Sequence, residues 1–136
     1  MNTQNDNKER LKHWSSILAR MHKGLMDFQM QEREQRTGQV LTPGTKLQLL
    51  LSDPEFNWLR VLSLLMVKVD DLIFQKEPIS EPLVAAARAD IRALLIERAN
   101  EDFNREYDAI KKFVPDVMRE VETLKNSLDG SPGLLH

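Results

Sequence analysis

The first apolar pattern along the chain is a heptad seam, which predicts one long helix over about residues 7–36. Its apolar positions alternate between three and four residues apart and therefore share one stripe of a helix. Asn5 or Asp6 is suited to cap its start, and Gly38 is suited to end it. The polar residues 29–36 continue the helix and are expected to be solvated. The seam consists of Leu11, Trp14, Leu18, Met21, Leu25 and Phe28.

Residues 37–45 are rich in Gly, Pro and Thr and predict a loop. Thr42 followed by Pro43 fits the cap and first position of a short helix that runs to about residue 51. The residues Ser-Asp-Pro-Glu at 52–55 have the spacing of a capping box and predict the start of another helix.

That next helix, about 54–76, is apolar over most of its circumference, so we expect several neighbours to bury it as the central helix of the fold. Ser63 and Asp70 are out of place on its apolar flank. One narrow face is polar and is formed by Asn57, Arg60, Lys68, Asp71 and Gln75.

The remaining chain predicts two more helices. Ser80 is suited to cap a helix of about 81–99, which carries an apolar stripe and several alanines. A last stripe continues in register through Pro115 and predicts one helix of about 101–128 that is kinked there. The change of phase between the two stripes favours a turn with Asn100 as its pivot, although a straight-through helix with a second buried face fits nearly as well.

These elements predict an all-α fold, a bundle of four long helices and one short helix in a single domain over residues 1–136. Residues 1–6 and 130–136 are expected to be loose termini. The chain has no Cys, which excludes disulfides and thiolate chemistry. The first 15 residues lack the apolar segment of a signal peptide, and the longest apolar run, at 64–67, is too short to cross a bilayer. We therefore expect a cytoplasmic protein with no membrane contact.

The sequence contains no pattern that points to a metal, a cofactor or a catalytic centre. His13 and His22 are nine residues apart, which is not the spacing of paired metal ligands on a helix, and no Glu-x-x-His motif occurs. A phosphate-binding Gly-rich loop and a Gly-x-Ser-x-Gly elbow are also missing. We predict no metal and no cofactor, and we favour a role other than catalysis.

Asp70 is the ionisable residue that most needs an explanation, because a carboxylate on an apolar flank must be paired, hydrogen-bonded or protonated. One interpretation is a salt bridge to one of the arginines at positions 20, 88 and 92. The other is a perturbed acid in a pocket that Ser63 and Met66 also line. We favour the salt bridge.

Two groups of residues are candidates for contact with a partner. Trp58 and Arg60 are of the types enriched in interaction hot spots, although a buried Trp beside a surface Arg explains them more simply. Ala85, Ala89 and Ile96 would allow another backbone to approach the 81–99 helix closely.

The net charge of −2 gives no general attraction to nucleic acid. Residues 1–36 carry seven basic and five acidic side chains, and residues 101–136 carry five and eight. These opposite charges suit packing between the first and last helices, or contact between copies of the chain.

The segment of residues 42–74, which includes LLLSDPEFNWLRVLSLLMVKVDDLIF, resembles a group of small all-helical bacterial proteins of unknown function. The resemblance implies a bacterial cytosolic helical protein and assigns no functional residue. We expect a non-catalytic interaction protein that forms a homo-oligomer, a dimer above all, or binds a protein partner. The alternative is a ligand-binding or enzymatic bundle with a polar site around Ser63 and Asp70, and nucleic-acid binding by the first helix is the weakest expectation.

Overall fold

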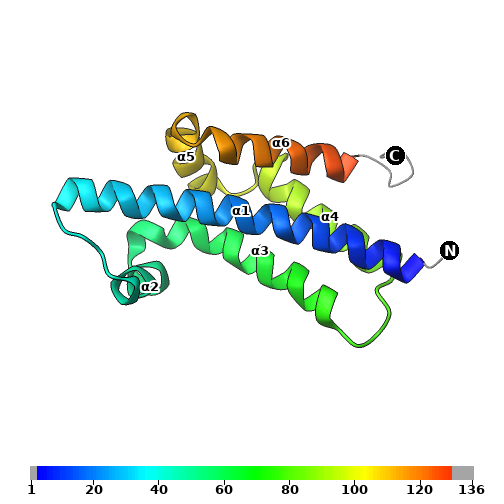
Figure 1. Cartoon of the computed structure of the whole chain (residues 1–136). Coiled ribbons are helices and arrows are strands. Elements are labelled where there is room, and N and C mark those ends of the chain that lie inside the picture. The colour runs from blue at the N-terminus through cyan, green and yellow to red at the C-terminus, as the bar shows by residue number, and fades with distance from the viewer. Residues whose placement is uncertain (1–2, 130–136) are drawn as a thin grey trace.

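The computed structural model describes residues 3–129, which form six α-helices and no strand (Figure 1). The all-α fold is therefore confirmed, while the expected number of five helices is wrong. The helices are α1 (Thr3–Thr37), α2 (Pro43–Ser52), α3 (Asn57–Phe74), α4 (Glu81–Leu95), α5 (Glu101–Ile110) and α6 (Pro115–Asp129).

The long helix α1 lies at the centre of the fold, between α3 on one side and α6 on the other (Figure 1). Its predicted seam is buried from Leu11 to Leu25, and only Phe28 at the end is half-buried. Gly24 allows α6 to approach α1 closely, because a Cβ at this position would lie 2.5 Å from Cγ2 of Val117. The expectation that α3 is the central helix is wrong, because α3 is covered by α1 but is exposed along its outer side.

Contacts between α1 and α6 match the opposite charges of the two ends of the chain. The Trp14 indole donates a hydrogen bond to Ser127 Oγ at 3.1 Å, and Arg20 pairs with Glu120 at 3.0 Å. The Arg88 guanidinium lies 5.6 Å from the centroid of the Trp14 ring, which is cation–π distance. These contacts hold α6 and α4 to the N-terminal half of α1.

Three predicted helix starts are confirmed by hydrogen bonds from side chains to free backbone N–H groups. Thr42, Ser80 and Asn100 cap α2, α4 and α5, accepting from the N–H three residues later. The predicted turn between the last two apolar stripes is therefore present, and Asn100 lies at its end. The helix before it, α4, ends at Leu95, earlier than the predicted residue 99.

The N-terminal end of α1 differs from the prediction, and the C-terminal end agrees with it. The helix begins at Thr3, so the expected cap at Asn5 or Asp6 lies inside it, and of residues 1–6 the last four are helical rather than loose. Residues 1–2 and 130–136 lie outside the described part of the chain. At the other end Gly38 stops the helix with a φ of 74°, a conformation that favours glycine.

The expected kinked helix of 101–128 is two helices. A 3₁₀ turn, Lys111–Phe113, follows α5, and Val114 leaves the helical conformation with φ −129° and ψ 64° before Pro115 begins α6. The residue before a proline is pushed out of the α region, and proline suits the first position of a new helix. The apolar stripe stayed in register across the break, which is why periodicity alone did not detect it.

The polar end of α1 is not a solvated overhang. Met30 is buried, and Arg33 forms ion pairs with Asp53 at 3.3 Å and Glu55 at 3.1 Å. Asp53 caps the 3₁₀ turn η1 (Pro54–Phe56), which precedes α3, and Glu55 lies within that turn. The last turns of α1 therefore fix the start of α3. Among residues 3–129, none of the helices combines the length and the apolar character needed to cross a bilayer.

Candidate functional site

Ser63 and Asp70, the two polar residues on the apolar flank of α3, both hydrogen-bond to side chains of α1. Ser15 Oγ donates to Asp70 Oδ1 at 2.6 Å, and His22 Nε2 lies 2.9 Å from Ser63 Oγ. Asp70 is therefore partnered by a serine and not by one of the three expected arginines. Arg20 and Arg88 instead contact α6 and Trp14.

The two pairs obey the geometry of an antiparallel helix pair. Moving seven residues along α1, from Ser15 to His22, moves the partner seven residues back along α3, from Asp70 to Ser63. Heptad spacing returns each helix to the same face, so the pairs lie in one seam. Gln29, seven residues further along α1, donates through Nε2 to Glu55 Oε1 at 3.1 Å, so a third polar pair links α1 to the 3₁₀ turn before α3. Polar pairs of this kind can fix the register between two helices.

Ser63 and His22 have the residue types of a nucleophile and its base, but their surroundings are unsuited to nucleophilic catalysis. Ser63 Oγ lies 3.3 Å from the Leu59 carbonyl, the usual partner of a serine within a helix. Burial lowers the pKa of His22 from its ordinary value, so the neutral ring is favoured. Backbone N–H groups in the middle of a helix already have partners, so no pair of donors is left to stabilise an oxyanion.

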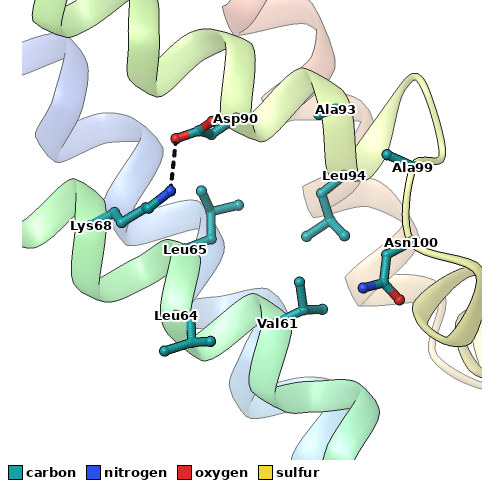
Figure 2. A pocket seen from close by; sticks show the side chains of 9 residues that line it. All are labelled: Val61, Leu64, Leu65, Lys68, Asp90, Ala93, Leu94, Ala99 and Asn100. Atoms are coloured by element: carbon teal, nitrogen blue, oxygen red, sulfur yellow. Dashed lines mark hydrogen bonds and ion pairs between the residues drawn. The ribbon is translucent and has the colours of Figure 1, made fainter.

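A pocket of about 400 Å³ lies on a different face, between α3 and α4 (Figure 2). Val61, Leu64 and Leu65 of α3 line it on one side, and Ala93 and Leu94 of α4 line it on the other. Lys68 and Asp90 form an ion pair of 3.4 Å at one end. A second pocket of about 200 Å³ adjoins the first and shares Leu65, Lys68 and Asp90 with it. Neither pocket includes Ser63 or Asp70, so this groove is an apolar surface feature separate from the polar seam.

The outer side of α3 carries the most exposed apolar side chains of the helix. Leu64, Val67 and Phe74 are 59%, 54% and 79% exposed. At 100° per residue they share one stripe with Arg60 and Asp71, which are also exposed. We call these five residues the outer α3 stripe. Leu64 lies in the middle of the narrow face of α3 that was predicted to be polar. A helical wheel that includes Leu64 shows that this face is partly apolar.

Helix α2 adjoins one end of the outer α3 stripe. Arg60 donates a hydrogen bond of 2.7 Å to the carbonyl of Leu51, the penultimate residue of α2. None of the residues of α2 is buried, and Leu47 and Leu51 are 57% and 66% exposed. An amphipathic helix normally covers its apolar stripe against a neighbour, so α2 lacks part of the cover its sequence calls for.

The predicted contact residues fall into three different environments. Trp58 is buried against the Phe103 ring, with the ring centroids 5.7 Å apart, and its indole N–H has no hydrogen-bond partner among the described residues. Arg60 is exposed, as predicted. Ala85 and Ala89 are exposed on α4, while Ile96 is half-buried against the core. The groove next to α3 uses Ala86 and other alanines of α4 instead.

A third described pocket, of about 190 Å³, lies where α4, α5 and α6 meet. Its basic side chains are paired, since Arg98 and Lys111 both contact Asp108. The hydrogen bond from Arg98 lowers the pKa of Asp108. Within residues 3–129, no group of three or more His, Asp or Glu side chains is arranged to hold a metal ion.

Comparison of the chain with protein-family models, with curated proteins and with solved structures found no match. The resemblance carried by residues 42–74 therefore stays an expectation.

Proposed function

We propose that this chain is a non-catalytic interaction protein that binds another polypeptide through the outer α3 stripe and the adjoining leucines of α2. The observation that carries the proposal is the contrast between pattern and burial on α3. The helix is apolar over most of its circumference, yet Leu64, Val67 and Phe74 remain more than half exposed.

Single exposed apolar side chains are ordinary, but a continuous group of them marks a contact surface. Fully burying a Leu, Val or Phe side chain is worth roughly 1.5–3 kcal/mol. Covering the exposed part of Leu64 or Phe74 would therefore contribute about 1–2 kcal/mol each. The Arg60 hydrogen bond places the end of α2 beside α3, and we include the exposed Leu47 and Leu51 of α2 in the proposed surface.

The polar residues first considered for a ligand site support the same view. Ser63 and Asp70 are engaged by His22 and Ser15 in the seam between α1 and α3. Both residues thus have partners inside the fold, and the exposed apolar surface is the better candidate for function.

The test is site-specific photo-crosslinking in living cells. A photoreactive amino acid replaces Leu64 in one variant and Val67 in a second, while the control places it at Met118, an exposed apolar residue of α6. We expect discrete polypeptide adducts from positions 64 and 67 and a much weaker signal from position 118. Equal adducts from all three positions, or none from α3, would contradict the proposal.

A further inference from the structure

The outer α3 stripe has the spacing of a heptad seam. From Arg60 through Leu64, Val67 and Asp71 to Phe74 the intervals are four, three, four and three residues. Such a stripe presents one continuous edge to a partner helix. Its sequence places two apolar residues in the middle, with a positive charge before them and a negative charge after them.

This order is self-complementary when the helix meets a copy of itself running in the opposite direction. With a two-fold axis between Leu64 and Val67, Leu64 of each chain faces Val67 of the other, and Arg60 of each faces Asp71 of the other. Symmetric dimers use such isologous contacts, in which one patch binds its own copy. A parallel pairing would instead place the two Arg60 side chains together and the two Asp71 side chains together, which is repulsive.

We propose that the polypeptide bound by this surface is a second copy of this chain, whose α3 packs antiparallel against this one. The inference rests on the proposed function and adds the identity of the partner and the register. Arg60 and Asp71 are both exposed. Arg60 uses one N–H of its guanidinium on the Leu51 carbonyl and has further donors, and Asp71 has no ion-pair partner among the described residues, so the two charges can pair across the dimer.

The same register accounts for Phe74 and α2. It brings Phe74 of the second copy opposite Asn57, which lies one turn before Arg60. This is the end of α3 at which Arg60 donates its hydrogen bond to the Leu51 carbonyl of α2. The incoming Phe74 would then approach the end of α2 at which Leu51 is exposed. In the dimer, Phe74 of each chain would thus cover exposed residues of α2 of the other chain.

The experiment is sedimentation equilibrium of purified full-length protein over about 1–500 μM, with charge-reversal variants. Arg60→Asp or Asp71→Arg alone places like charges at both ends of the interface, and we expect each to weaken dimerisation about tenfold or more. An equimolar mixture of the two variants places opposite charges at both ends again. We expect this mixture to form dimers within about threefold of wild-type affinity.

Arg119→Asp on α6 is the matched control, because it makes the same charge change away from α3, and we expect wild-type dimerisation from it. The mixture also controls for any loosening of α2 when Arg60 loses its bond to Leu51, since only charge pairing rescues it. A dimer insensitive to both reversals, or a mixture that stays dissociated, would overturn the register. A wild-type chain that is monomeric throughout, while positions 64 and 67 still crosslink to other polypeptides, would overturn self-pairing and leave the proposed function standing.

Discussion

Replacing Ser15 and Asp70 with alanine, singly and together, tests whether Asp70 is a structural residue. Ser15 Oγ donates to Asp70 Oδ1 at 2.6 Å across the α1–α3 seam, and both residues are half-buried. A hydrogen bond to a charged group contributes about 1.5–3 kcal/mol when it is well shielded. Partial exposure reduces that value, so we expect a coupling free energy of about 1 kcal/mol between the two substitutions.

The single variants should not cost the same. Ser15→Ala leaves the carboxylate half-buried without its donor, so it should lower the free energy of unfolding by about 1–2 kcal/mol. Asp70→Ala loses the same bond but gains about 0.5 kcal/mol in helix propensity. The double-mutant cycle cancels such single-residue effects and isolates the pair.

The assay is urea unfolding followed by circular dichroism at one low protein concentration, because any dimerisation would make the apparent stability depend on concentration. Lys23 and Asp27, an exposed pair on α1 at 2.7 Å, provide the control cycle, for which about 0.3–0.5 kcal/mol is expected. A Ser15–Asp70 coupling no larger than this control would refute the reasoning. An Asp70→Ala variant more stable than wild type would do so as well, and would return Asp70 to the role of a functional acid, since such residues often cost stability.

Three further predictions concern the packing and the pH response of the fold. Gly24→Ala should lower the free energy of unfolding in the same assay, because the crowding of its Cβ, 2.5 Å from Val117 Cγ2, outweighs the roughly 1 kcal/mol that alanine gains over glycine inside a helix. Gly44→Ala in α2 meets no atom within 4 Å and should not destabilise the protein. Gly38→Ala should cost about 1 kcal/mol through its φ of 74°. Burial lowers the folded-state pKa of His22 below its ordinary 6.5, so the stability it contributes is present above that pH and lost below it. Unfolding free energies measured from about pH 7.5 to about pH 5.5 should fall more steeply for wild type than for His22→Gln.

Local sequence rules predicted the elements whose cause is local. The seam from Leu11 to Leu25, the caps at Thr42 and Ser80 and the turn at Asn100 each depend on residues within a few positions of one another. The break before Pro115 is also local, but the continuing apolar register outweighed it in the prediction.

The partner of Asp70 could not be predicted in this way. Ser15 is 55 residues earlier in the chain and carries no charge, so nothing marked it as the donor until the two helices were placed side by side. The outer α3 stripe was missed for a different reason. Apolar periodicity predicts that a side chain prefers burial, but it does not distinguish burial within the chain from burial against a partner, and Leu64 is of the second kind in this account.

The most direct test of the central claim is sedimentation equilibrium of the wild-type chain beside Leu64→Lys, with Met118→Lys as the control. Leu64 is 59% exposed, so lysine there should leave the free energy of unfolding of the monomer within about 0.5 kcal/mol of wild type. The account predicts a monomer–dimer equilibrium for wild type and Met118→Lys, and a monomer for Leu64→Lys at the same concentrations. A wild-type chain that remains monomeric, or a dimer that Leu64→Lys leaves intact, would contradict it.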